Sequence, residues 1–117
     1  MGLSTHVLDT MHGCPAAGMQ VALFTLQGEA ATLVKKLRLN SDGRPPDGPL
    51  YDDGELKSGT YRLEFDVADY FKAKGAVLPE PNFLGRVSLD FGVADASQHY
   101  HVPLLVSPWA YSTYRGS

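Results

Sequence analysis

Two histidines, His99 and His101, occupy alternate positions in an apolar segment near the carboxyl end of the chain. Because the side chains of an extended strand alternate between two faces, both imidazoles point the same way, about 6.5–7 Å apart along the strand. The opposite face carries the residues expected in the core: Tyr100, Val102, Leu104 and Val106. The two imidazoles therefore face away from the core. Leu105 shares their face, which indicates that another surface covers it.

Four further side chains could transfer protons or bind anions, namely His6, His12, Arg44 and Arg115. An imidazole titrates near neutral pH and can take a proton from water, whereas a guanidinium offers several donors to carboxylate, amide or enolate oxygens. This set suits the hydrolysis of a polar carbonyl compound. The same residues also fit a purely structural role, as exposed strand and loop residues.

Three other kinds of site can be weighed against this one. Alternate histidines on a strand could bind Zn²⁺ with a third ligand such as His6, although no carboxylate or cysteine accompanies the pair at a known spacing. Cys14 could act as a nucleophile beside His12, but a cysteine followed by proline in a turn is more often structural. The glycines between positions 43 and 48 lack the pattern of a phosphate-binding loop followed by a helix, which excludes a nucleotide site there.

Length and composition limit the class of protein. The 117 residues suffice for one domain, residues 1–117, with its own core. The net charge is −3 and the basic residues are scattered, so nucleic acid is not expected as a partner. The single cysteine favours a reducing compartment, and no apolar run of about 18 residues predicts a membrane span. Because the first residues also lack a secretory signal, we expect a cytoplasmic protein.

Short strands separated by turns must position these residues. Alternation marks the segments 3–9, 32–39, 59–65, 84–93, 99–107 and 110–115, while residues 19–26 are apolar almost throughout, which predicts a strand buried on both faces. Asp66 as N-cap and Gly75 as a left-handed stop delimit the single expected helix. Seven or eight short strands with one helix favour an all-β fold, an antiparallel β-sandwich.

The chain resembles the 5-hydroxyisourate hydrolases, the transthyretin-related enzymes of urate breakdown. The matching segments cover essentially the whole chain in order: Leu3-Ser-Thr-His-Val-Leu-Asp9 with Gly13-Cys-Pro-Ala16, Ser41-Asp-Gly-Arg44, His99-Tyr-His-Val-Pro-Leu-Leu105 with Ser107-Pro108, and Tyr111-Ser-Thr-Tyr-Arg-Gly-Ser117. The terminal Tyr-Arg-Gly-Ser is the most specific of these, because true transthyretins share the fold but lack it. They also lack the histidine of the first strand and the histidine pair.

This resemblance implies a transthyretin-like sandwich of two four-stranded sheets, with a short helix between the fifth and sixth strands. It also implies a homotetramer whose active sites lie at the subunit interface, and no metal or other cofactor. By position, the family's catalytic residues correspond to His6, Arg44, His101 and Ser117. Residues that would bind the substrate are His6, Arg44, His99, Tyr114, Arg115 and Gly116.

The implied reaction is the hydrolytic opening of the six-membered ring of 5-hydroxyisourate, which gives 2-oxo-4-hydroxy-4-carboxy-5-ureidoimidazoline. Water would attack the ring carbonyl next to the hydroxylated carbon, and His101, alone or together with His6, would accept its proton. Arg44 would hold substrate oxygens and offset the negative charge of the intermediate. The polar histidines argue against a rival function, the binding of a hydrophobic, hormone-like ligand, since such ligands need an apolar lining.

The chain departs from this family in two places. Phe83-Leu-Gly-Arg86 stands where many relatives have a Phe-Phe-Pro element, and Trp109-Ala110 stands where Tyr-Gly is common. Neither change removes a catalytic group. We interpret both as changes of the scaffold that bear on subunit packing or channel shape.

Overall fold

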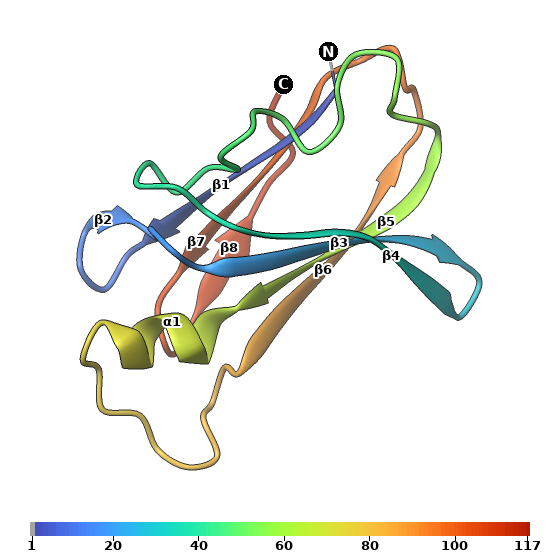
Figure 1. The fold of residues 1–117 in the computed structure, drawn as a ribbon. Helices are drawn as coiled ribbons and strands as arrows, with labels where there is room; N and C mark the ends of the chain where they lie inside the picture. Colours follow the sequence, from blue (N-terminus) through green and yellow to red (C-terminus); the bar gives the residue numbers. More distant parts are fainter. Residues whose placement is uncertain (1) are drawn as a thin grey trace.

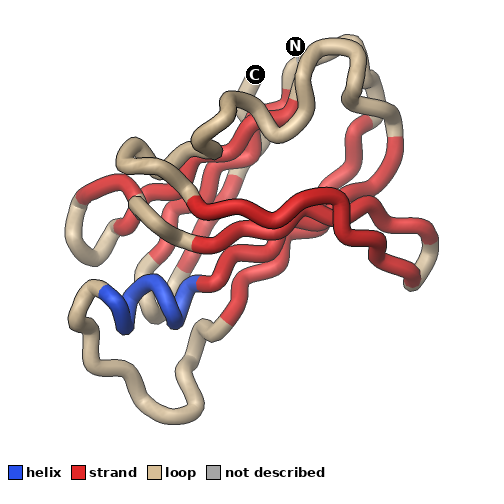
Figure 2. The backbone as a smooth tube through the Cα atoms, in the orientation of Figure 1, coloured by secondary structure: helices blue, strands red, loops and turns tan. Residues whose placement is uncertain are grey.

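The computed structural model describes residues 2–117, which form two four-stranded β-sheets packed face to face and one short helix (Figures 1 and 2). The strand order is β2-β1-β7-β8 in the first sheet and β4-β3-β5-β6 in the second. The elements are β1 (Leu3–Asp9), β2 (Cys14–Pro15), β3 (Gln20–Gln27), β4 (Ala30–Arg38), β5 (Gly59–Asp66), α1 (Val67–Ala73), β6 (Arg86–Val93), β7 (Tyr100–Val106) and β8 (Tyr111–Thr113). The predicted sandwich with its single helix is confirmed.

The first sheet is built around a strand pair that joins the two ends of the chain. β1 runs parallel to β7, with Leu3 opposite Tyr100 and Asp9 opposite Val106. The β1–β2 and β7–β8 pairs and all pairs of the second sheet are antiparallel, as expected. A parallel pair needs a long crossover connection, and here the connection contains the whole second sheet. Both termini therefore lie at the same end of the sandwich (Figure 1).

The core lies between the sheets and confirms the predicted faces of β7. Tyr100, Val102, Leu104 and Val106 are buried, whereas His99 and His101 are half-buried. Phe65 and Phe71 are among the largest side chains that solvent does not reach. Each sheet thus has one face against the core and one face turned outward.

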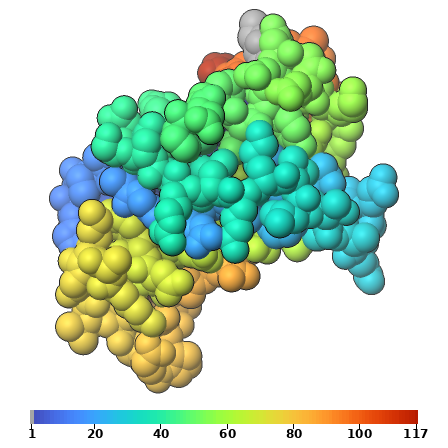
Figure 3. Space-filling model, in the orientation of Figure 1, coloured from blue at the N-terminus to red at the C-terminus, as the bar shows by residue number. Residues whose placement is uncertain are grey.

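Strand β3 differs from the prediction that it is buried on both faces. Val21 and Leu23 are buried, but Ala22 and Phe24 between and after them are half-buried, so the strand packs one face on the core. Its partner β4 is an edge strand and is exposed almost throughout. The apolar run of β3 therefore reflects half-covered outer residues rather than a second buried layer. The turn between β3 and β4 projects from the body of the molecule (Figure 3).

Helix α1 lies where it was predicted, but its N-cap works differently. Asp66 precedes the helix without a side-chain cap hydrogen bond, and its carboxylate instead accepts a hydrogen bond from Arg86 Nε of β6 at 3.0 Å. Gly75 follows the helix with a φ of 90°, as expected of a left-handed stop. Among residues 2–117, no helix has the length and apolar character needed to cross a membrane.

A buried carboxylate ties the end of β1 to α1. Asp9 is 1% exposed and accepts hydrogen bonds from the His12 backbone N–H at 2.9 Å, from His12 Nδ1 at 2.6 Å and from the Tyr70 hydroxyl at 2.8 Å. Burial alone would raise the pKa of Asp9, but the hydrogen bonds from His12 and Tyr70 outweigh it and hold the pKa below its usual range. The charged carboxylate therefore fixes the turn after β1 against the helix.

We expect Asp9→Asn to lower the free energy of unfolding by about 1–3 kcal/mol, because it removes a charged acceptor from a buried hydrogen-bonded site. The folded-state pKa of Asp9 is depressed. The wild type therefore has a higher free energy of unfolding than Asp9→Asn at pH values above the unfolded-state pKa of about 4. This difference is lost as the pH falls through the lower folded-state pKa. Urea unfolding at about pH 7 and about pH 3 should give a smaller difference at the lower pH. An equal difference at both values would contradict this account.

The two places where the chain departs from the family pattern contact each other. Phe83, in the loop between α1 and β6, packs against Trp109, in the turn between β7 and β8, with ring centroids 5.8 Å apart. Both side chains are exposed, at 68% and 58% respectively. The two departures therefore form one exposed aromatic pair rather than two unrelated changes.

Candidate active site

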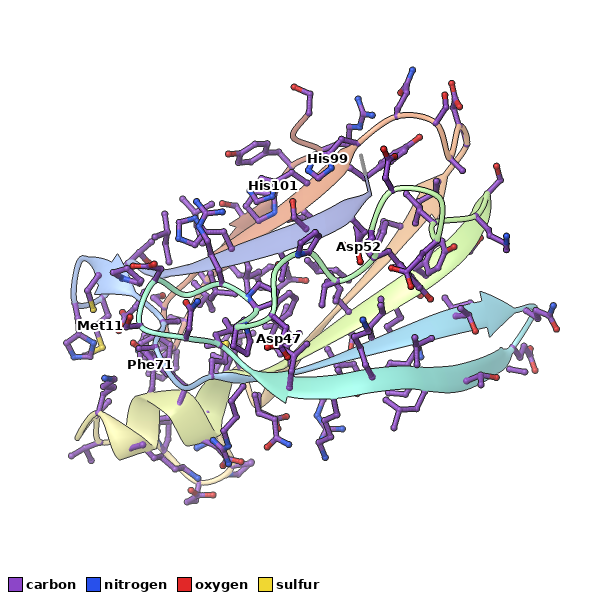
Figure 4. All side chains as sticks on the ribbon, turned by 45° about the horizontal axis from the view of Figure 1, so that its top comes forward. Met11, Asp47, Asp52, Phe71, His99 and His101 are labelled. Carbon is purple, nitrogen blue, oxygen red and sulfur yellow. The ribbon has the colours of Figure 1, made fainter. Side chains whose placement is uncertain are left out.

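The site residues predicted on the first and seventh strands share the outer face of the first sheet. In the parallel register of β1 and β7, Ser4 lies opposite His101 and His6 lies opposite Pro103. Alternation places Ser4 and His6 on the same side as His99 and His101, away from the core. Figure 4 shows His99 and His101 near each other over β1 and β7. The sheet thus brings three predicted histidines together.

One serine connects two of these histidines. The Ser4 hydroxyl lies 3.0 Å from His99 Nε2 and 2.8 Å from His101 Nδ1, and the Gly2 backbone N–H donates to His99 Nδ1 at 3.1 Å. Gly2 has to be a glycine here, because a Cβ would collide with the carbonyl oxygen of Tyr51. Both ring nitrogens of His99 are therefore bound by groups of the protein itself.

Ser4 is the residue of this site that the sequence did not reveal. It lies two positions before His6 in a strand with clear alternation, so its place on the outer face could be predicted. Its contacts are with residues 95 and 97 positions away, and no local pattern indicates them. The pairing of β1 with β7 is therefore what brings Ser4 to the two histidines.

The loop between β4 and β5 carries Arg44 to this face. The Asn40 side-chain oxygen accepts hydrogen bonds from the backbone N–H groups of Asp42 at 2.9 Å and Arg44 at 3.1 Å. The loop is fastened to β1 by the Gly43 carbonyl, which accepts from the Val7 N–H at 2.9 Å. Gly43 has a φ of 72°, and a Cβ there would collide with the Val7 carbonyl oxygen, so this close approach requires glycine. The Arg44 side chain itself is exposed.

The same loop holds His6. The Nε2 atom of His6 lies 2.9 Å from the backbone carbonyl oxygen of Asp42. Because a carbonyl oxygen can only accept, Nε2 carries the hydrogen of this bond. In the neutral ring, Nδ1 is therefore the nitrogen with the lone pair.

The pKa of His101 is shifted by burial and by the groups around its ring. Burial lowers the pKa of His101 below its usual range, and the proximity of Arg44, His6 and His99 lowers it further. A hydrogen bond with the Ser4 backbone acts in the opposite direction but does not outweigh them. Since an imidazole ordinarily titrates near pH 6.5, His101 is neutral at about pH 7. The Arg44 guanidinium and a neutral His101 imidazole therefore lie together on one polar face.

The last residues of the chain pair with the start of β7 beside His101. The Gly116 N–H donates to the His101 carbonyl at 2.7 Å, and the His101 N–H donates to the Gly116 carbonyl at 3.1 Å. A Cβ on Gly116 would lie 3.0 Å from His101 Cβ and 3.1 Å from Cδ2, so the backbone runs very close to the ring. Ser117 follows directly and is exposed.

Two other predicted site residues, Tyr114 and Arg115, do not face the histidine rings in the single chain. The Arg115 guanidinium lies over the Tyr100 ring, 4.3 Å from its centroid, and donates to the Gln98 side chain at 3.0 Å and to the His99 carbonyl at 3.2 Å. Tyr114 and Arg115 line a cavity of about 330 Å³ between β6 and β7. Arg115 thus anchors the terminal segment.

A second cavity opens next to His99. It measures about 250 Å³ and is lined by Ser4, Thr5, Arg44, Pro45, Gly48, Pro49 and His99. Cavities that enclose small organic ligands typically measure about 300–1,000 Å³. The cavity is open to solvent, so a ligand bound here would keep one side that this chain does not cover.

The two alternative sites find no support in the geometry. Among residues 2–117, no group of three or more His, Cys, Asp and Glu side chains is placed so that it could hold a metal ion. The ring of His12 is held by Asp9. The exposed Cys14 lies near Tyr70 instead, whose pKa is raised by burial, by the hydrogen bond to Asp9 and, to a smaller extent, by Cys14. His12 and Cys14 are thus not arranged as a base and its nucleophile.

Comparison with known proteins places these features in a family. Residues 3–116 match the HIUase/Transthyretin family. A protein of Rhizobium meliloti (strain 1021) named 5-hydroxyisourate hydrolase 2 is 54% identical over 115 residues, which are 98% of this chain and 95% of that protein.

Solved structures agree with this match. The structure of Klebsiella pneumoniae 5-hydroxyisourate hydrolase is similar with a TM-score of 0.79 and 32% identity, and the match covers 100% of both chains. The crystal structure of (S)-allantoin synthase is similar with a TM-score of 0.94 and 46% identity, over 99% of this chain but 43% of that longer chain. Since the family match spans almost all of the described residues and the relative is 54% identical, the chain belongs to the HIUase/Transthyretin family.

Proposed function

We propose that this protein hydrolyses 5-hydroxyisourate to 2-oxo-4-hydroxy-4-carboxy-5-ureidoimidazoline, a step of urate breakdown. The observation that carries this proposal is the gathering of His6, Arg44 and His101 on one outer face of the β1–β7 pair. The relatives named 5-hydroxyisourate hydrolase support the choice of substrate. The substrate is a small, polar carbonyl compound, and the site offers imidazoles and a guanidinium to it.

The chemistry follows from these groups. Water attacks the ring carbonyl next to the hydroxylated carbon, an imidazole takes its proton, and the proton goes on to the departing ring nitrogen. A positioned general base of this kind is typically worth about 10²–10⁴-fold in rate. Arg44 offsets the negative charge that develops on the carbonyl oxygen in the intermediate. Neither step needs a metal ion, so we propose that His6, Arg44, His101 and Ser117 form the catalytic set without a cofactor.

The terminal residues complete the site in this proposal. Gly116 runs against the His101 ring, and Ser117 is the next residue along the chain. We assign substrate contacts to Tyr114, Arg115 and Gly116 together with His6 and Arg44, whereas His99, which the resemblance also suggested, has both ring nitrogens bound within the protein. In the single chain, Tyr114 and Arg115 face another cavity, so their contacts would be made to substrate bound next to a second subunit.

We further propose a homotetramer in which subunits cover each other's sites, in the cytoplasm. The open side of the 250 Å³ cavity supports this, because a second subunit would enclose the substrate. Strands β6 and β8 are edge strands of their sheets and can pair with another copy. Large exposed aromatic side chains also suit an interface: Phe83, Trp109, Tyr111 and Tyr114.

The test is the decay of 5-hydroxyisourate, freshly generated from urate and followed by ultraviolet absorbance. We expect the purified protein to accelerate the decay, and a chelator in excess to leave the rate unchanged, because the site is built from imidazoles and a guanidinium. Decay at the spontaneous rate in the presence of folded protein would overturn the function. Loss of the acceleration on chelation would instead overturn its independence of metal.

A further inference from the structure

The hydrogen bonds around Ser4 begin at a backbone N–H, a group that can only donate. The Gly2 backbone N–H donates to His99 Nδ1 at 3.1 Å, and an amide nitrogen cannot accept. His99 Nδ1 must therefore carry a lone pair. A neutral imidazole has a single N–H, which leaves the hydrogen of His99 on Nε2.

His99 Nε2–H donates to the Ser4 hydroxyl oxygen over 3.0 Å, so Ser4 acts as acceptor in this contact. Among the described residues, the other hydrogen-bond partner of this hydroxyl is His101 Nδ1 at 2.8 Å, so the one hydroxyl hydrogen of Ser4 has its acceptor there. His101 Nδ1 accepts this hydrogen, which places the ring proton of neutral His101 on Nε2. The chain of donors thus runs one way, from Gly2 through His99 and Ser4 to His101.

His6 has the opposite character. Its Nε2–H is directed to the Asp42 carbonyl, so its second nitrogen, Nδ1, offers a lone pair in the neutral ring. The two imidazoles therefore present complementary atoms, an N–H on His101 and a lone pair on His6. A neutral imidazole with a fixed N–H stabilises a developing oxyanion as a hydrogen-bond donor, while the imidazole with the lone pair acts as the base.

We propose that Ser4 and His99 are positioning residues that hold His101 in its Nε2–H tautomer, so that His101 donates a hydrogen bond to the reacting carbonyl oxygen and His6 acts as the base. This inference rests on the proposed hydrolysis. The water oxygen bonds to the carbonyl carbon, the carbonyl pair moves to its oxygen, and the water proton moves to His6 Nδ1. When the intermediate collapses, the carbon–nitrogen bond breaks, and the nitrogen takes its electron pair together with the proton from His6. His6 returns to neutral and His101 keeps its proton throughout.

The direct test is the tautomeric state of the rings, which does not depend on any substrate. Long-range proton–nitrogen correlation spectra of the full-length protein, labelled with ¹⁵N-histidine, report which ring nitrogen carries hydrogen. We expect the Nε2–H form for both His99 and His101. In Ser4→Ala we expect His101 to lose this preference, and in Ser4→Thr, which keeps the hydroxyl, we expect it to be retained. Ser112→Ala, at a serine on β8 of the same sheet, serves as the matched control and should not change the rings.

Kinetics provide the second readout. Because Ser4 acts through one neutral hydrogen bond, Ser4→Ala should lower kcat about 3- to 10-fold with little change in KM, and Ser4→Thr should restore it. An Nδ1–H form of His101 in the wild-type protein would overturn the assignment, and so would an unchanged His101 tautomer in Ser4→Ala. An inactive protein that shows the expected tautomers would refute the hydrolase function alone. The two failures are therefore distinguishable.

Discussion

Replacing His101 with Asn is expected to lower kcat for 5-hydroxyisourate by at least about 10²-fold while the fold is retained. The Asn side-chain oxygen can take the place of His101 Nδ1 and accept the Ser4 hydroxyl, which now lies 2.8 Å from that nitrogen. The Nε2–H of the imidazole has no counterpart in Asn, so the interaction with the reacting carbonyl is lost. Because that interaction is strongest in the transition state, kcat should fall more than KM changes.

Steady-state kinetics and the circular dichroism spectrum together check this result. The matched control is His12→Asn, at a partly exposed histidine that bonds Asp9 at the end of β1 and takes no part in the proposed site. It should keep kcat near the wild-type value and change only stability. Near-normal activity of His101→Asn would remove His101 from the mechanism.

Deletion of Arg115, Gly116 and Ser117 should lower activity by at least about 10²-fold, because it removes the backbone that packs against His101. The two hydrogen bonds between Gly116 and His101 disappear, and so does the Arg115 guanidinium that clamps the segment over Tyr100. The core does not depend on these residues, because Arg115 and Ser117 are exposed and Gly116 is half-buried. The thermal midpoint should therefore stay within a few degrees of the wild type.

A graded variant separates the position of the ring from the simple presence of the terminus. In Gly116→Ala, the new Cβ would lie 3.0 Å from His101 Cβ, so the backbone or the ring has to move by a few tenths of an ångström. We expect its activity to fall between those of the wild type and the truncated protein. A truncated protein with full activity would show that the terminal residues have no catalytic role.

The parts of the site that depend on local alternation could be predicted from the sequence. A strand has a period of two, so the outward direction of His99 and His101 follows from the apolar residues between them. The helix position was also predictable from its flanking residues. Its cap was not, because Arg86, which is 20 residues away on β6, binds the Asp66 carboxylate. The preference of Asp for the N-cap position did not decide the outcome, because the folded sheet places Arg86 next to the Asp66 carboxylate.

The parts that depend on long-range pairing could not be predicted from the residues alone. Nothing near Ser4 indicates that it lies between two rings, and nothing near Asp42 indicates that its carbonyl holds His6. For Arg115, by contrast, the terminal motif suggested a contact with substrate. In the single chain its guanidinium lies over Tyr100, on the core side of β7 rather than on the histidine side.

The parallel pairing of the first strand with the seventh sets the order in which the protein can assemble during synthesis. Ser4 and His101 are 97 residues apart in the chain, so β1 has no partner on its β7 edge until nearly all of the protein has been made. At about 5–20 residues per second, that interval lasts on the order of 5–20 s. All four strands of the second sheet precede β7 in the chain and can pair during this time, whereas the catalytic face forms last. A nascent chain released before residue 100 would therefore carry an unpaired, aggregation-prone strand and no active site.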